Sequence, residues 1–387
     1  MALGKFQFGG RGKGKDKSAA GDKPAKGKQG GKQAGKAGGN AEAGNAAGGG
    51  IGGKLPLGRS GGMPIAVDFG TRTLKALQFS PGDRPTLHAA AQATTPDDLL
   101  DDPIARLGFQ RQTLTGWVKK GVFKGKRAVC TVPASHTSCT QARLARVDGV
   151  DMDALVSAHL ADTLKCEPSA IVQRWFETPT STGKSEVLCL AAARALVTRL
   201  MDTLRESGLE PVGMQSEYVA VLRGLQRVSR AGESAATLYL DLGHAATRAV
   251  IGHGREPVFA RSIAVGAREL APAPELAAVG LAGPAGGGEA ACDPCEALTD
   301  ELAVGVRHHR SVFGETPIEA VVFAGGGAAS TESCMRVAKV LRVPASVADP
   351  FAGVPVEKRA HVVGVDLSKP QPGWAAAMGL CLCPADL

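Results

Sequence analysis

Two short segments of the sequence place an aspartate immediately before a glycine-containing turn. The first runs from Asp68 to Lys75 (DFGTRTLK) and the second from Asp241 to Thr247 (DLGHAAT). Small turn residues let backbone N–H groups face an anion without a Cβ in the way. Phosphate repels the two carboxylates, but they can hold the hydration shell of Mg²⁺, which keeps several of its waters. The two segments therefore predict a site for a polyphosphate and Mg²⁺.

Each residue type in these segments has a predicted role. Asp68 and Asp241 are the predicted metal residues, because carboxylates suit hydrated Mg²⁺. Lys75 adds a point positive charge. A single aspartate–glycine turn is more often only a turn, so the prediction depends on the presence of both. The predicted phosphate contacts are Gly70, Thr71, Thr73, Gly243 and Thr247.

Both segments lie in predicted β-hairpins, which must hold the two aspartates in place. Residues 64–69 and 73–79 form the first hairpin, and residues 236–242 and 247–252 form the second. Strands and helices alternate through the rest of this part, which predicts an α/β protein. The two similar hairpins predict a duplicated lobe. Further strands are expected near 86–94, 126–133, 171–176, 186–192, 211–215 and 318–323, and helices near 102–122, 151–165, 195–207, 218–225, 333–341 and 374–382.

The first 62 residues differ in composition from the rest. They are mainly Gly, Lys and Ala, with twelve Lys or Arg residues against three acids. The chain has a net charge of +8, so residues 63–387 contain one more acidic residue than basic. A segment with few large apolar residues cannot bury enough surface to fold. We expect a disordered basic tail that is solvated or binds an anionic membrane surface or nucleic acid.

Other motifs in the chain give weaker signals. Residues 48–54 fit G-x-x-x-x-G-K, but Leu55 stands where a P-loop has Ser or Thr. Cys292 and Cys295 form a C-x-x-C pair, whose alternatives are loop cysteines or a zinc site completed by the histidines at 308–309. The chain has nine cysteines, no predicted secretion signal and no run of 18 apolar residues. We therefore expect reduced thiols and a cytoplasmic protein without a transmembrane segment.

Five segments together resemble the actin/Hsp70/sugar-kinase superfamily. The two aspartate–glycine segments resemble its first and second phosphate loops. Residues 323–328 (FAGGGA) resemble the adenosine-binding glycines, and residues 216–222 (SEYVAVL) and 375–380 (AAAMGL) resemble the two interlobe helices. The resemblance implies a two-lobed, actin-like fold of the duplicated ribonuclease H type.

A narrower resemblance is to the PilM family of type IV pilus assembly. Residues 126–133 (KRAVCTVP), then a polar turn and Arg143-Leu144, are similar to the PilM and FtsA pattern, in which a small subdomain is inserted into the first lobe. Residues 208–212 and 259–266 are also similar to PilM. The implied organisation is a first lobe at 63–232 with the inserted subdomain at about 126–182, a second lobe at 233–350, and a return to the first lobe at 351–387.

The PilM resemblance implies a cytoplasmic, ATP-binding scaffold that is peripheral at the inner membrane. Its partner would be the cytoplasmic tail of a PilN-like membrane protein, in a type IV pilus or a type II secretion system. Two alternatives stay open, an actin-fold kinase and an FtsA-like division or cytoskeletal protein. FtsA ends in an amphipathic membrane helix, for which residues 380–387 are too short and too uncharged.

The resemblance also assigns residues to the nucleotide. Glu217 would assist hydrolysis, and Asp241 would serve catalysis by orienting Mg²⁺ and its waters. The alternative for Glu217 is a helix N-terminal acid that favours the macrodipole, and the alternative for the glycines is a flexible turn. The implied activity is at most a weak ATPase. The glycines that would let the nucleotide approach the backbone are Gly325, Gly326 and Gly327.

Overall fold

The computed structural model describes residues 63–82, 84–145, 149–178, 185–229, 235–271, 293–314 and 316–383. All of these residues belong to one structural unit. The predicted basic tail at 1–62 lies outside them, and so does Cys292 of the C-x-x-C pair. Within the described ranges, no helix is long and apolar enough to cross a membrane.

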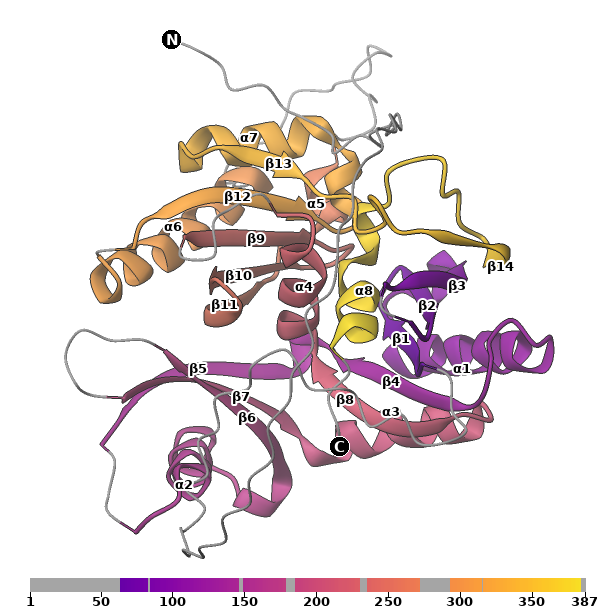
Figure 1. Ribbon diagram of the computed structural model, residues 1–387. Helices are drawn as coiled ribbons and strands as arrows, with labels where there is room; N and C mark the ends of the chain where they lie inside the picture. Colours follow the sequence, from indigo (N-terminus) through magenta and orange to yellow (C-terminus); the bar gives the residue numbers. More distant parts are fainter. Residues whose placement is uncertain are drawn as a thin grey trace, which may run out of the picture. The chain divides into compact units, whose positions relative to one another are not determined.

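Two sheets share one strand order, as the predicted duplication requires (Figure 1). The first has the order β14-β3-β2-β1-β4-β8 and the second β11-β10-β9-β12-β13. In each, three consecutive strands pair antiparallel and two later strands add in parallel next to the first of them. The first sheet has one more strand, β14, which pairs in parallel with β3 at its edge. The strands are β1 (Ile65–Phe69), β2 (Thr73–Ser80), β3 (Thr86–Thr94), β4 (Arg127–Val132), β8 (Glu210–Ser216), β9 (Ala236–Leu242), β10 (Thr247–His253), β11 (Glu256–Ile263), β12 (Ile318–Ala324), β13 (Ala345–Val347) and β14 (Val356–Val363).

The central strands are apolar because both of their faces are covered. In β9, Leu238 and Leu240 join the core beneath α6 (Pro294–Val312) and α7 (Thr331–Leu341), while Tyr239 joins the core on the opposite face. The first sheet is built in the same way, with α1 (Pro103–Lys119) and α3 (Arg194–Glu206) on one face. A strand whose two faces are buried needs a nearly continuous apolar sequence, which explains why the predicted central strands are confirmed.

Two buried helices lie between the sheets, α4 (Glu217–Gln226) and α8 (Ala375–Leu382), and they cross each other in close contact (Figure 1). The crossing depends on two glycines. A Cβ on Gly224 would lie 2.0 Å from the carbonyl oxygen of Ala375, and a Cβ on Gly379 would lie 1.8 Å from that of Ala220. Only glycine lets the two backbones approach so closely. The crossing joins the two sheets into one core, because residues of both sheets pack against these helices.

A third sheet, in the order β5-β7-β6, carries the helix α2 (Met152–Leu164). Its strands are β5 (Thr137–Leu144), β6 (Ile171–Thr178) and β7 (Ser185–Ala193). The predicted bounds of the inserted subdomain, 126–182, are wrong at both ends. β4 belongs to the first sheet, where it pairs in parallel with β1 and β8, and β7 is the central strand of the third sheet.

Several elements are absent from the prediction because their residues show no apolar period. β5 is rich in Thr, Ser and Gln, and its pairing with β7 over eight residues holds it in place. β14 is mostly exposed and pairs in parallel with β3 at the edge of the first sheet. There, the Glu357 carboxylate lies 2.8 Å from Nδ1 of His88. The strand conformation of such segments is determined by pairing with strands distant in sequence and not by the local sequence.

Candidate functional site

A cavity of about 270 Å³ lies where the β1–β2 turn, the β9–β10 turn and the glycines after β12 meet. Three acidic and three basic side chains line it, so their formal charges balance. The acids are Asp68, Glu217 and Asp241, and the bases are Arg72, Lys75 and Arg248. A cavity whose walls are turns and paired charges suits a polar, anionic ligand better than an apolar one.

The first hairpin places Asp68 and Lys75 opposite each other in the β1–β2 ladder. Nζ of Lys75 lies 3.9 Å from Oδ2 of Asp68, and the Thr131 hydroxyl donates to Oδ1 at 3.3 Å. The turn itself is held in place by Gln110 of α1, whose amide donates to the Gly70 carbonyl at 2.7 Å. A Cβ on Gly70 would lie 2.8 Å from the Thr73 carbonyl oxygen, so this tight turn favours glycine.

The second hairpin repeats this arrangement with an arginine. Asp241 and Arg248 are opposite each other in the β9–β10 ladder, as Asp68 and Lys75 are in the first. A terminal nitrogen of the guanidinium, Nη1, lies 3.3 Å from Oδ2 of Asp241. The guanidinium also lies against the turn, because a Cβ on Gly243 would come within 1.8 Å of Nη1. The space that glycine leaves in this turn is therefore occupied by Arg248.

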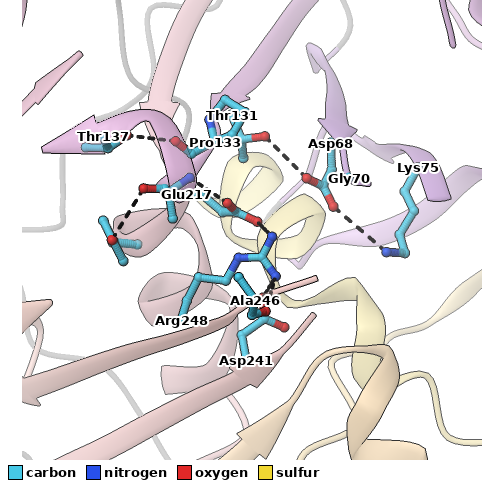
Figure 2. Close-up of polar contacts among 12 residues, drawn as sticks. Asp68, Gly70, Lys75, Thr131, Pro133, Thr137, Glu217, Asp241, Ala246 and Arg248 are labelled. Carbon is cyan, nitrogen blue, oxygen red and sulfur yellow. Dashed lines mark hydrogen bonds and ion pairs between the residues drawn. The ribbon is translucent and has the colours of Figure 1, made fainter. Parts of the chain in front are cut away.

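Glu217, the first residue of α4, contacts the second hairpin and the backbone that follows β4 (Figure 2). Its Oε1 lies 2.8 Å from Nη2 of Arg248, and its Oε2 accepts a hydrogen bond from the Ala134 backbone N–H at 2.7 Å. Figure 2 shows the guanidinium pointing between Glu217 and Asp241. Both oxygens of Glu217 thus have donors, and one guanidinium contacts two of the three carboxylates.

Burial shapes the ionisation of these groups. Burial, with smaller effects of the neighbouring charges, raises the pKa of Asp68 to about 6. Burial also raises the pKa of Asp241, against the opposing charge of Arg248. For Arg248, burial would lower the pKa, but the charges of Glu217, Asp241 and Asp68 together raise it, so the guanidinium stays protonated. The site keeps a fixed positive charge among carboxylates, of which Asp68 is the least fully compensated.

The glycine turn after β12 closes the cavity. Gly325 has a φ of +85°, which favours glycine, and a Cβ there would lie 2.3 Å from the Leu242 carbonyl oxygen. Its N–H donates to the Pro372 carbonyl at 2.9 Å. A Cβ on Gly326, in contrast, would meet nothing within 4 Å. Gly325 therefore packs the turn onto the second hairpin, and Gly326 exposes backbone to the cavity.

The structure brings all but one of the predicted site residues to the cavity wall. The exception is Thr247, which is fully buried and donates its hydroxyl to the Val265 carbonyl at 2.7 Å, away from the lining. The predicted phosphate contact of Thr247 is therefore not supported by its position. The roles of the others stay predictions. Those at the wall are Asp68, Gly70, Thr71, Thr73, Lys75, Glu217, Asp241, Gly243, Gly325, Gly326 and Gly327.

Sequence reasoning missed Arg248, although a signal for it existed. Both hairpins read Asp, any residue, Gly, then a basic residue seven positions after the aspartate, which is Lys75 in the first and Arg248 in the second. Because an antiparallel hairpin with turns of equal length gives equal register, the same offset places both cations opposite their aspartates. Comparison of the two repeats would have assigned both.

The residues present fit a polyphosphate. The turn at Gly70, the Lys75 ammonium and the open backbone at Gly326 face one cavity. The fit to Mg²⁺ differs between the two predicted metal residues. Asp68 accepts from the Thr131 hydroxyl and has the Lys75 ammonium at 3.9 Å, whereas Asp241 has the Arg248 guanidinium closer, at 3.3 Å. Across the described ranges, no three His, Cys, Asp or Glu side chains are grouped so that they could hold a metal ion.

Comparison with known proteins gives matches in structure and none in sequence. No protein-family model matches the chain, and no curated protein matches it. A chain of the PilM-PilN type IV pilus biogenesis complex matches with a TM-score of 0.64 and 21% identity, over 83% of this chain and 98% of that one. A Bacteroides thetaiotaomicron protein with an actin-like ATPase fold and unknown function has a TM-score of 0.45 and 10% identity, over 78% and 96%.

A more distant match is the cytoplasmic domain of EpsL, an inner-membrane component of the Vibrio cholerae type II secretion system. It has a TM-score of 0.36 and 12% identity, and the match covers 53% of this chain and 71% of that domain. The match to the PilM-PilN complex carries the comparison, because it covers nearly the whole of that chain at the highest TM-score of the three. The predicted two-lobed architecture is confirmed: the chain has a PilM-like, actin-like fold.

Proposed function

We propose that this chain is a cytoplasmic, ATP-binding adaptor of the inner-membrane platform of a type IV pilus or a related secretion system. The observation that carries the proposal is the structural match over 98% of a chain from the PilM-PilN complex. In this proposal the chain is held at the membrane through a partner, by capturing the cytoplasmic tail of a PilN-like membrane protein. The glycine turns and the Lys75 ammonium at the cavity lining support a phosphate-containing ligand.

In the proposed complex with ATP, two turns hold the phosphates from opposite sides. The turn at Gly70 offers backbone N–H groups and the Lys75 ammonium, and Arg248 reaches the cavity from the second hairpin. Gly325 to Gly327 let the nucleotide approach the backbone. Asp68 is the residue that would hold any Mg²⁺ bound with the nucleotide, through the waters of the ion.

Nucleotide binding without rapid turnover fits the contacts of the carboxylates. Glu217, the predicted hydrolytic residue, already accepts from the Ala134 N–H and contacts Arg248. A carboxylate with both oxygens engaged by donors is a poor base for water. The same contacts weigh against a kinase, which needs a base for its substrate, because Asp68 and Asp241 also have cationic partners. The nucleotide is then a structural ligand that holds the lobes together.

The adaptor role is tested with a PilN-like membrane protein from the same organism. A synthetic peptide of its cytoplasmic N-terminal segment is titrated into the full chain, in the presence and absence of ATP, and binding is followed by fluorescence anisotropy. We expect saturable binding with a Kd on the order of 1–10 µM. A peptide of the same composition in scrambled order is the control and is expected not to bind. Equal binding of the two peptides, or binding of neither to ATP-loaded protein, contradicts the proposal.

A further inference from the structure

The two hairpins form a pair of matched aspartate–cation contacts across one cavity. Asp68 faces Lys75 in the first ladder, and Asp241 faces Arg248 in the second. The two contacts differ in closeness, at 3.9 Å for the lysine and 3.3 Å for the arginine. The arginine also contacts Glu217 at 2.8 Å. The second hairpin therefore has a cation of its own, held by two carboxylates.

Arg248 is built into this position and is not a mobile surface side chain. Its side chain is 15% exposed, and its carboxylate partners Glu217 and Asp241 are 6% and 10% exposed. The guanidinium occupies the space beside Gly243 that any larger residue would fill. It still lines the cavity, so one edge faces the ligand space. A planar guanidinium has five N–H donors, enough to contact two carboxylates and a phosphate together.

We propose that Arg248 is a built-in cation that contacts the polyphosphate from the second hairpin and takes the place of a divalent ion there. This inference rests on the proposed nucleotide binding. Its consequence is that this chain binds ATP with nearly the same affinity whether or not Mg²⁺ is present. The reason is that Arg248 already stands between Glu217 and Asp241 and offsets their charge, so a divalent ion is not needed there to keep the two carboxylates from repelling the phosphates.

The test compares ATP binding to the full chain in excess Mg²⁺ and in excess EDTA, by calorimetry. For the wild-type chain we expect the two Kd values to agree within about threefold. For Arg248→Gln we expect binding in EDTA to weaken at least about tenfold, and Mg²⁺ to restore much of it. ATP binding to the variant is expected to depend on Mg²⁺, because removal of the guanidinium leaves Glu217 and Asp241 free to hold a divalent ion.

Arg223→Gln is the matched control. Arg223 is also a largely buried arginine, 14% exposed, in contact with a carboxylate, that of Glu256, but it lies outside the cavity lining. Its variant is expected to bind ATP as the wild type does in both buffers. Wild-type binding that is lost in EDTA overturns the inference and leaves nucleotide binding standing. An Arg248→Gln variant that behaves as the wild type also overturns the inference. If the wild-type chain binds no ATP in either buffer, the proposed nucleotide binding is refuted as well. The wild-type comparison decides even if the variant does not fold.

Discussion

Gly379→Val is expected to destabilise the protein by at least about 3 kcal/mol, and enough to prevent folding of much of the chain. A Cβ at this position would lie 1.8 Å from the carbonyl oxygen of Ala220, and that atom belongs to the backbone of α4. Helix backbone cannot rotate away as a side chain can, so α4 and α8 must separate. Because residues of both sheets pack on these helices, the separation disrupts the shared core. Urea unfolding followed by circular dichroism measures the loss.

Gly116→Ala is the control for this prediction. Gly116 also lies in a helix, α1, but a Cβ there would meet nothing within 4 Å. The alanine variant is expected to be as stable as the wild type or more stable by about 0.5–1 kcal/mol, because alanine favours helix over the unfolded chain. If the free energy of unfolding of Gly379→Val is within about 1 kcal/mol of that of the wild type, the two helices do not cross as closely as described.

Glu217→Ala is expected to cost about 3 kcal/mol of folding stability. The substitution removes one of the two carboxylates that neutralise Arg248, and it leaves the Ala134 N–H without its acceptor. Both losses occur in buried surroundings, where an uncompensated charge or donor is costly. Glu217→Gln is expected to cost less, because its amide oxygen can still accept a hydrogen bond. Guanidinium chloride unfolding of the three proteins gives the comparison.

The control for Glu217 is Glu256→Ala, which removes the carboxylate partner of Arg223. Glu256 is 51% exposed, so its ion pair is screened by water, and the variant is expected to lose no more than about 1 kcal/mol. A double-mutant cycle of Glu217→Gln with Arg248→Gln is expected to give a coupling of about 1.5–3 kcal/mol. A coupling near zero would mean that the two groups do not interact in solution.

The hairpins and central strands could be predicted because burial on both faces requires an apolar sequence. β1 and β9 are buried on both faces and are therefore apolar, and each ends in an aspartate and a glycine turn. β5 and β14 could not be predicted in this way. Their residues are polar or exposed, and their conformation follows from partners that are distant in sequence. The same limit applies to Thr247, whose buried hydroxyl depends on the position of Val265.

The site was predicted in its composition more than in its electrostatics. The motifs named the acids Asp68, Glu217 and Asp241 and one of the cations, Lys75, and the cavity contains all four. The contact between Glu217 and Arg248 joins α4 to β10, and no local pattern indicates that these residues meet. Yet this contact changes the expected chemistry, because it engages the carboxylate that the resemblance assigned to hydrolysis.

Nucleotide binding at this cavity is decided by calorimetric titration of the full chain with ATP in excess Mg²⁺, alongside Lys75→Met. We expect one saturable site with a Kd on the order of 1–100 µM for the wild type, weakened at least about tenfold by Lys75→Met. Lys369→Met is the matched control, because Lys369 is 77% exposed, pairs with Asp366 and lies outside the cavity lining. It is expected to bind as the wild type does. A wild-type chain that shows no binding at millimolar ATP, or a Lys75→Met variant that binds ATP unchanged, contradicts nucleotide binding between these two hairpins.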